Sequence, residues 1–256
     1  MSALSIFIGY DNREDDAYRI CRASLTRRAS RDLHITALDQ DALRKVGLYE
    51  RYSSWDGKDR VDSLDLKPFS TDFSFTRFLV PHLSLFQGWA LYCDCDFLFT
   101  ADVAELFEEA DPQYAVMCVH HYYDPQEKIK MAGQTQTKYY RKNWSSLVLW
   151  NCAHPANARL TVNHVNTFPG SWLHAFQWLD DDQIGHLPKT WNFLSGVNTR
   201  DKDEFPPCGV HFTLGTPDRP GYENSPFADL WFAERDSRRG SGGPHPSERL
   251  RAIEAA

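Results

Sequence analysis

The sequence lacks several features that define membrane and secreted proteins. No apolar stretch among its 256 residues reaches the ~20 residues that span a bilayer. The apolar run in residues 1–10 is too short for a signal peptide and has no basic flank. We therefore expect no transmembrane segment, while peripheral contact with a membrane stays open. The chain also has no internal repeat.

Acidic residues also outnumber basic ones. The formal net charge is −7, and no long basic run is present. Because nucleic-acid backbones require a positive field, we expect no nucleic-acid partner. The six cysteines lie mostly inside apolar segments, at a lower density than in a secreted disulfide scaffold. We interpret this pattern as that of a reduced, cytoplasmic protein.

The composition that remains is that of a folded α/β protein. Hydrophobic residues make up 42% of the chain and charged residues 25%, which suits a sizeable core. Aromatic residues reach 14%, a share that serves either a core or the binding of carbohydrate rings. We predict a single domain over residues 1–235 and a disordered tail over 236–256, where Gly, Ser and Pro gather.

Apolar runs and helical periodicities alternate along the chain. They predict strands at residues 4–9, 33–38, 89–93, 114–120 and 146–150. They predict helices at residues 14–28, 75–86, 102–110, 155–164, 171–179 and 226–235. Residues 49–71 are expected to form a loop, and the polar segment 124–143 a mobile loop over a site. The opening order of strand, turn, helix and strand indicates a mostly parallel sheet flanked by helices.

Two acids follow the apolar run at 89–93. If the chain stays extended, the carboxylates of Asp94 and Asp96 lie on the same side of it. Their repulsion and lost hydration would be relieved by a divalent cation, and oxygen ligands suit Mg²⁺ or Mn²⁺. Two alternatives stay open. The acids could cap a turn, or Cys93 and Cys95 could bind zinc, although no second cysteine pair with finger-like spacing supports zinc.

The residues around this motif resemble the glycosyltransferases of family 8, which are glycogenin-like and bacterial galactosyltransferase-like. The stretch Phe75-Thr76-Arg77-Phe78-Leu79 precedes Leu91-Tyr92-Cys93-Asp94-Cys95-Asp96, as an Arg-bearing helix precedes the family's Leu-Tyr-Leu-Asp-x-Asp strand. Further short motifs follow in the family's order: Ser146 to Asn151, Asp182-Gln183-Ile184, Leu187-Pro188, Trp191-Asn192 and His211-Phe212-Thr213-Leu214-Gly215. The resemblance spans roughly residues 6–231.

The resemblance implies a GT-A fold with a Rossmann-like nucleotide-binding half. It also implies a metal-dependent, retaining glycosyltransferase of the hexosyltransferase type, with a UDP-sugar donor and an acceptor that no motif identifies. Asp94, Asp96 and His211 would hold Mn²⁺ or Mg²⁺, and an imidazole ligand favours Mn²⁺. The alternative for His211 is a strand-end histidine bonded to a backbone carbonyl.

Four further residues are candidates for donor binding. Asp11 would hydrogen-bond the nucleotide base at the carboxyl end of the first strand, or it would cap the helix that follows. Arg77 would contact the donor phosphate or sugar, or form a salt bridge on a helix surface. Arg219 could clamp the diphosphate, although the family has a lysine near this place. Gly215 of the C-terminal motif completes this set.

Asp182 and Gln183 are the candidate catalytic residues. The resemblance implies that they face the anomeric carbon, where Asp182 could be a nucleophile and Gln183 could stabilise developing positive charge. The alternative is an acidic helix end on the surface. The sequence departs from the family at Asn143-Trp144-Ser145-Ser146, and residues 120–123 match nothing in it.

Two other functions compete with glycosyl transfer. A sugar-nucleotide pyrophosphorylase shares the nucleotide-binding half but has a Gly-rich, basic loop after the first strand, which residues 10–14 do not form. A catalytically inactive, nucleotide-binding protein with a GT-A-like fold is the second alternative. The complete set of Asp94, Asp96 and His211 argues against it.

Overall fold

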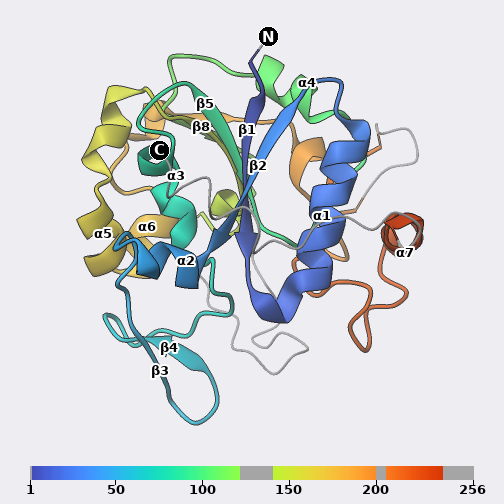
Figure 1. The fold of residues 1–256 in the computed structure, drawn as a ribbon, viewed down its shortest axis with the longest axis horizontal. Coiled ribbons are helices and arrows are strands. Elements are labelled where there is room, and N and C mark those ends of the chain that lie inside the picture. Colours follow the sequence, from blue (N-terminus) through green and yellow to red (C-terminus); the bar gives the residue numbers. More distant parts are fainter. Residues whose placement is uncertain (1, 122–140, 200–205, 239–256) are drawn as a thin grey trace.

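The computed structural model describes residues 2–121, 141–199 and 206–238, and these form a mixed α/β fold (Figure 1). Its centre is a six-stranded sheet in the order β2-β1-β5-β8-β7-β9. The strands are β1 (Leu4–Tyr10), β2 (Leu33–Asp39), β5 (Trp89–Cys93), β8 (Leu147–Asn151), β7 (Val116–Cys118) and β9 (Ile184–His186).

The sheet is mostly parallel. Strand β1 pairs in parallel with β2 and β5, and β7 pairs in parallel with β9. Only β8 runs against its neighbours, β5 and β7. Every residue of β8 is buried, as are most residues of β1 and β5, which agrees with strands that are covered on both faces. The predicted fold class is therefore confirmed.

Helices cover both faces of this sheet (Figure 1). Helix α1 (Asp15–Arg28) and helix α7 (Ala228–Arg238) lie on one side and pack against each other. Shorter helices lie on the other side: α3 (Val80–Leu83), α5 (Val162–Thr167) and α6 (Gly170–His174). Two more helices follow strands: α2 (Gln40–Lys45) follows β2, and α4 (Val103–Glu108) follows β6 (Phe97–Phe99). The 3₁₀ helices are η1 (Asn12–Glu14), η2 (Thr76–Leu79), η3 (Trp144–Ser146), η4 (Pro155–Arg159), η5 (Asp181–Gln183) and η6 (Lys189–Asn192).

A second, three-stranded sheet adjoins the first. Its order is β10 (Phe193–Leu194), β11 (Gly209–His211) and β6 (Phe97–Phe99). Strand β6 follows β5 after only three residues, so the chain passes directly from the large sheet into the small one. This junction contains Asp94 and Asp96. Because β11 pairs with β6, it brings residues more than a hundred positions away to the same corner.

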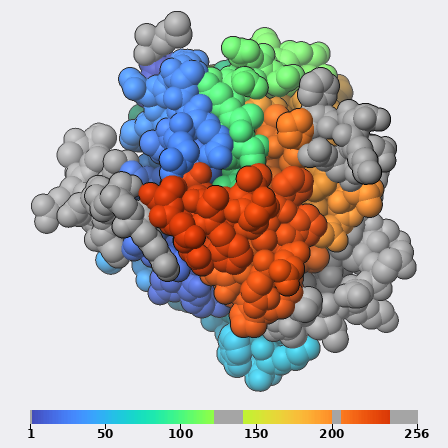
Figure 2. Space-filling view, turned by 90° about the vertical axis from the view of Figure 1, so that its right-hand side faces the viewer, coloured from blue at the N-terminus to red at the C-terminus, as the bar shows by residue number. Residues whose placement is uncertain are grey.

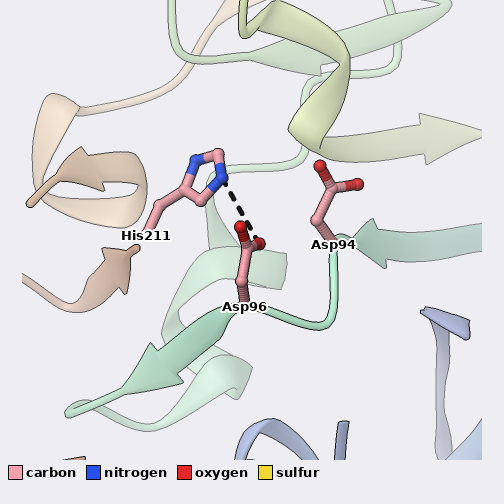
Figure 3. A group of neighbouring side chains, drawn as sticks. All are labelled: Asp94, Asp96 and His211. Atoms are coloured by element: carbon pink, nitrogen blue, oxygen red, sulfur yellow. Dashed lines mark ion pairs between the residues drawn. The ribbon is translucent and has the colours of Figure 1, made fainter. Parts of the chain in front are cut away.

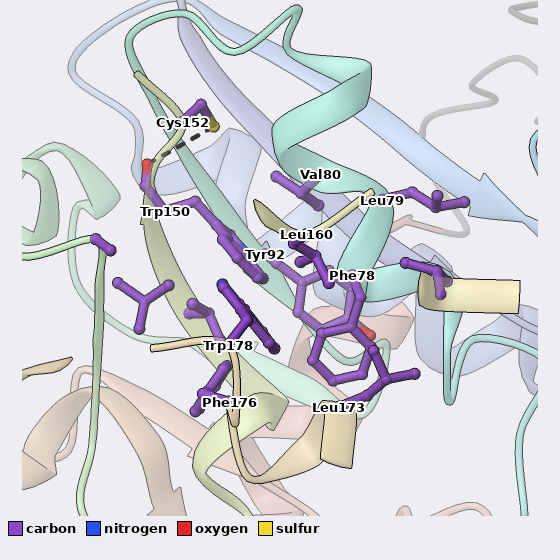
Figure 4. Packing of buried hydrophobic residues seen from close by; sticks show 14 of the residues in the cluster. Phe78, Leu79, Val80, Tyr92, Trp150, Cys152, Leu160, Leu173, Phe176 and Trp178 are labelled. Atoms are coloured by element: carbon purple, nitrogen blue, oxygen red, sulfur yellow. Dashed lines mark hydrogen bonds between the residues drawn. The ribbon is translucent and has the colours of Figure 1, made fainter. Parts of the chain in front are cut away.

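Most of the large aromatic side chains pack in the core. On the side covered by α3 and α6, Trp150 and Trp178 stack with ring centroids 6.1 Å apart, and Phe176 and Phe78 pack edge-on against Trp178 (Figure 4). These four side chains are buried. The high aromatic content therefore serves mainly the core of the fold, as the first of the two interpretations had it.

Residues 49–71 contain a β-hairpin where the sequence predicted a loop. Strands β3 (Ser53–Trp55) and β4 (Arg60–Asp62) pair antiparallel, and the hairpin projects from the body of the protein (Figure 1). Its base is held by the buried ion pair of Arg51 with Asp62. Arg51 also donates to the backbone oxygens of Val165 and Phe168, at 2.9 and 2.7 Å. The sequence did not predict the hairpin, because three-residue strands are too short for a periodic signal and the backbone oxygens that hold Arg51 lie more than a hundred residues along the chain.

Other differences from the sequence prediction have similar causes. The helix expected over 155–164 is divided into η4 and α5, because Thr161 caps a new helix by accepting from the backbone N–H of His164. Helix α7 extends to Arg238 and so includes the first three residues of the predicted tail. Residues 239–256 and 124–140 lie outside the described residues. Among the described helices, none combines the length and apolarity that crossing a bilayer requires.

The buried ion pair predicts a large stability effect. Asp62→Ala leaves the Arg51 guanidinium buried without its counter-charge, so the free energy of unfolding should fall by about 3–5 kcal/mol. The double variant Arg51→Met/Asp62→Leu should recover part of this loss, because no uncompensated charge remains. Urea unfolding followed by circular dichroism measures both values. A single variant within about 1 kcal/mol of wild type would contradict the anchoring role.

Candidate metal centre

Asp94 and Asp96 lie in a turn rather than in an extended strand. Strand β5 ends at Cys93, the chain turns at Cys95 and Asp96, and β6 begins at Phe97. The backbone N–H of Asp94 donates to Ser146 O at 2.9 Å, and Asp96 O accepts from the N–H of Phe212 at 3.0 Å. The two carboxylates therefore meet because the chain crosses between sheets, and not by the strand alternation that the sequence prediction assumed.

The imidazole of His211 completes this group. One side-chain ligand atom from each of Asp94, Asp96 and His211 lies within 4.8 Å of the others (Figure 3). His211 Nε2 is 3.3 Å from Asp96 Oδ1. The predicted metal ligands are thus brought together from the β5–β6 turn and the end of β11. Two hard carboxylates and one imidazole match the donor preferences of Mn²⁺ and Mg²⁺ sites.

A hydrogen-bond chain fixes the orientation of His211. Its Nδ1 lies 3.0 Å from Asn192 Oδ1, and Asn192 Nδ2 donates to Ser146 Oγ at 2.9 Å. Since Nδ1 faces an amide oxygen, the network assigns a proton to Nδ1 and directs Nε2 toward the acids. The ring also stacks on Phe97 with centroids 4.5 Å apart. The partner of His211 is therefore a side-chain amide, not the backbone carbonyl of the alternative interpretation.

Asp94 is partly balanced by groups of the protein. Its Oδ1 accepts from the Tyr92 hydroxyl at 2.7 Å and lies 2.9 Å from Arg77 Nη1. The Arg77 guanidinium is itself held by Ser145 O at 2.8 Å and by Phe73 O at 3.3 Å. Burial raises the pKa of Asp94, the charge of Arg77 lowers it, and the nearby Asp96 raises it again. Arg77 is buried, so it does not form the exposed salt bridge that the sequence left open.

Glu14 is a further acid at this corner that the sequence analysis missed. Its Oε2 accepts from the Cys95 thiol at 3.3 Å, and its Oε1 lies 3.2 Å from Arg219 Nη2. Burial, followed by the charge of Asp96, raises the pKa of Glu14 to about 7. An acid just before a helix is typical of any helix start, so no local pattern could have distinguished Glu14.

These groups lie in a cleft with a volume of about 680 Å³, a size typical of small-molecule sites. Arg77, Gly215 and Arg219 line it together with the metal-ligand candidates. Seven lysine and arginine side chains and five acidic ones form its wall, although the whole chain is acidic. At Gly215, with φ +157°, an added Cβ would lie 2.7 Å from the Tyr222 ring, so a larger residue does not fit there.

Asp11 lies outside the lining of the cleft. Its side chain is buried, accepts from the backbone N–H of Arg13 at 2.9 Å and of Asp72 at 3.0 Å, and pairs with the Arg13 guanidinium. Burial acts to raise the pKa of Asp11, but the bonds from Arg13 and Asp72 outweigh it and the pKa lies below its ordinary value. This is the capping arrangement. Contact with a nucleotide base stays a prediction.

The structure does not bring Asp182 and Gln183 to the cleft. They lie in η5, immediately before β9, and Ile184 pairs with Val116, which in turn pairs with Trp150. Trp150 opposes Ala90 of β5, so Ile184 lies about four residues, roughly 13 Å, from Asp94 along the strand direction, and three strands across the sheet. Asp182 and Gln183 precede Ile184 and therefore lie farther still from Asp94. Neither residue lines the cleft, and Asp182 is exposed. The acidic surface end of the alternative interpretation describes them better.

Helix α6 occupies the cleft wall instead. Gly170, Ser171 and His174 line the cleft, and His174 Nδ1 lies 2.8 Å from Ser145 Oγ. Burial, together with the charges of Arg77 and Arg51, holds the pKa of His174 well below its ordinary value, so the imidazole is neutral at physiological pH. The sequence offered no signal for this residue, because a lone histidine in a short helix matches no motif.

No family model matches this chain, but a plant protein is similar to it in sequence over most of its length. Protein CDI from Arabidopsis thaliana is 49% identical to it over 233 residues, which cover 90% of this chain and 85% of that protein.

Solved structures share its fold at low identity. The galactosyltransferase LgtC in complex with donor and acceptor sugar analogues has a TM-score of 0.58 and 11% identity, and the match covers 96% of this chain and all of LgtC. The bifunctional glycosyltransferase WbbM reaches 0.57 at 15% identity over 96% of this chain and 51% of WbbM. The glycosyltransferase GlyE of Streptococcus pneumoniae reaches 0.55 at 15% identity, covering this whole chain and 64% of GlyE. These likenesses show a GT-A fold, as predicted.

The raised pKa of Glu14 predicts a pH-dependent stability. Because the folded pKa lies above the ordinary 4.5, the native state gains stability as pH falls from about 7 towards 4.5, and the buried charge costs stability above 7. Glu14→Gln should therefore be more stable than wild type at pH 8 by about 1–3 kcal/mol, with the difference vanishing near pH 4.5. Urea unfolding with EDTA measures it, and the exposed Asp16→Asn is the control. A difference independent of pH would contradict the assignment.

Proposed function

The chain belongs to the family of the Arabidopsis thaliana Protein CDI, and we propose that it is a metal-dependent glycosyltransferase that moves a sugar from a UDP-sugar to an acceptor. The observation that carries this proposal is the meeting of Asp94, Asp96 and His211 on the wall of a cleft in a GT-A fold. Proteins of the same fold that are named glycosyltransferases, LgtC and GlyE among them, support it. So does the sequence resemblance to family 8.

Asp94, Asp96 and His211 would hold Mn²⁺ or Mg²⁺. The bound cation would supply neutralising charge to the leaving diphosphate as the bond between sugar and phosphate breaks. Asn192 keeps the lone pair of His211 Nε2 directed at the site, which is the orienting role that partners of metal-bound histidines commonly have. Arg77 orients the carboxylate of Asp94, because backbone oxygens hold the guanidinium of Arg77 in place.

Arg219 is the proposed clamp for the diphosphate. It lines the cleft, its side chain is 43% exposed, and its partner Glu14 is a carboxylate that a phosphate can replace geometrically. Gly215 lines the cleft on the same segment, and the Tyr222 ring occupies the place that a Cβ would take there.

A retaining outcome is proposed from the family 8 resemblance. Asp182 and Gln183 lie at the other end of the sheet, whereas the neutral His174 and Ser171 of α6 line the cleft and are candidates for sugar binding. Imidazole and hydroxyl groups donate to and accept from sugar hydroxyls.

All six cysteines are free thiols, which supports the proposed cytoplasmic location.

The donor site predicts a metal-dependent change in thermal stability. With Mn²⁺ present, UDP or a UDP-sugar should raise the melting temperature of the wild type, because ligand binding stabilises the native state by mass action. Asp96→Ala should lose this shift, while Asp16→Ala, an exposed acid on α1, should keep it. Differential scanning fluorimetry over a nucleotide panel makes the measurement. No shift with any nucleotide in the wild type would refute the proposal.

The imidazole predicts a metal preference. Nitrogen ligands favour Mn²⁺ over Mg²⁺, so the wild type should bind UDP more tightly with Mn²⁺ than with Mg²⁺. His211→Asn replaces the nitrogen with an amide oxygen donor, and the ratio of the two affinities should fall at least fivefold. Calorimetric titration of UDP in each metal gives the ratio. An unchanged ratio would remove His211 from the proposed ligand set.

A further inference from the structure

The β3–β4 hairpin adds an aromatic and basic wall to the cleft. It projects from the body at one end of the molecule, as the cyan segment of Figure 2 shows. The cleft reaches it, since Trp55, Lys58 and Lys67 line the same cavity as Asp94 and Asp96. The hairpin therefore bounds the part of the cavity beyond the candidate metal centre. None of these three residues belongs to the donor site described above.

Trp55 contributes little to the hairpin's own packing. It ends β3, and 67% of its surface is exposed. The hairpin is secured instead by the buried pair of Arg51 with Asp62, so its position does not depend on the indole. An exposed tryptophan in the wall of a cleft offers a flat apolar face, and such faces stack on planar or ring-shaped ligands.

Lys58 and Lys67 give the same wall positive charge. Both are exposed, and within the described part of the chain neither takes part in an ion pair. Arg60 between them differs, because it pairs with Asp72 and packs over the Phe69 ring at 4.7 Å. Asp59 and Asp65 also line the cleft, and the carboxylate of Asp65 accepts from the backbone N–H of Lys67 at 3.0 Å and of Gly170 at 3.3 Å. Together with Arg60, the cationic side chains of this wall outnumber the acidic ones by three to two.

We propose that Trp55, Lys58 and Lys67 form the acceptor subsite, and that the acceptor is a glycoside carrying an anionic group, either a carboxylate or a phosphate. A sugar ring would stack on the indole of Trp55 while the lysines bind the anion. The proposal rests on the proposed glycosyl transfer, because it assigns the cleft beyond the donor to the second substrate. Charge complementarity supports this occupant, since Lys58 and Lys67 form no ion pair within the described residues of a chain whose net charge is −7.

The hairpin has a second set of exposed apolar residues that separates this proposal from docking to a lipid surface. Tyr52, Leu64 and Leu66 are 73%, 48% and 73% exposed, yet none of them lines the cleft. If the hairpin docked on a membrane, these residues would matter as much as Trp55. In an acceptor subsite only Trp55 matters. Tyr52→Ala is therefore the matched control for Trp55→Ala.

The test titrates three probes: p-nitrophenyl glucuronide, the neutral p-nitrophenyl glucoside and glucose 6-phosphate. Ligand-observed NMR gives dissociation constants for wild type, Trp55→Ala, Tyr52→Ala and Lys58→Gln/Lys67→Gln, all with Mn²⁺ and UDP. An anionic probe should bind the wild type more tightly than the glucoside, and the two anionic probes distinguish carboxylate from phosphate. Trp55→Ala should weaken binding at least tenfold, and Tyr52→Ala should not change it. The lysine variant should lose only the preference for the anion.

Three results would overturn the inference. The wild type could bind none of the probes, Trp55→Ala could bind them as the wild type does, or Trp55→Ala and Tyr52→Ala could both reduce binding to phosphatidylcholine vesicles without affecting the saccharides. The UDP-dependent melting shift is recorded for every variant in parallel. A shift that persists while the saccharide result fails refutes the acceptor subsite alone, whereas its absence in the wild type refutes the donor site.

Discussion

Crowding of negative charge in one corner is the constraint on which the site depends. Glu14, Asp94 and Asp96 approach one another where β5 of the large sheet passes into β6 of the small one. Burial and the charge of Asp96 raise the pKa of both Glu14 and Asp94, and positive and hydrogen-bonding groups surround these acids. Arg77 faces Asp94, and Arg219 faces Glu14. A divalent cation held with His211 would complete this balance.

Two buried arginines link this corner to the rest of the cleft. Arg77 connects Asp94 with the backbone at Ser145, whose hydroxyl in turn meets His174 of α6. Arg51 joins the hairpin base to the segment just before α6 through Phe168 O and lies 3.9 Å from the Phe75 ring centroid. Removing either guanidinium would leave a carboxylate without its counter-charge. The two walls of the cleft are thus tied to the core by ion pairs, and not by apolar contacts alone.

The similar sequence and the similar structures support different conclusions about this protein. Identity of 49% to Protein CDI sets the family, whereas 11–15% identity to LgtC, WbbM and GlyE speaks only for the GT-A architecture. Here α6 presents a neutral histidine, and a projecting hairpin presents a tryptophan. In a shared fold, function depends on the side chains at the site and not on the architecture.

Local pattern in the sequence determined much of this protein. The apolar runs predicted β1, β2, β5 and β8, helical spacing predicted α1, and a pair of acids after a buried strand marked the candidate metal centre. His211 was named only through its resemblance to a family motif, because nothing nearby in the chain distinguishes it. Such signals can be recognised without a structure because they depend on residues that are close together in the sequence.

Only the tertiary structure decided which distant residues meet. Asp182 and Gln183 do not lie at the site, because the register of β9 places η5 at the other end of the sheet. It added Glu14 and His174, whose roles arise from burial and charge contributed by other segments. It also formed the β3–β4 hairpin, whose short strands depend on an ion pair buried against residues 165–168. Strand register and burial are properties of the whole fold, and no local window of sequence contains them.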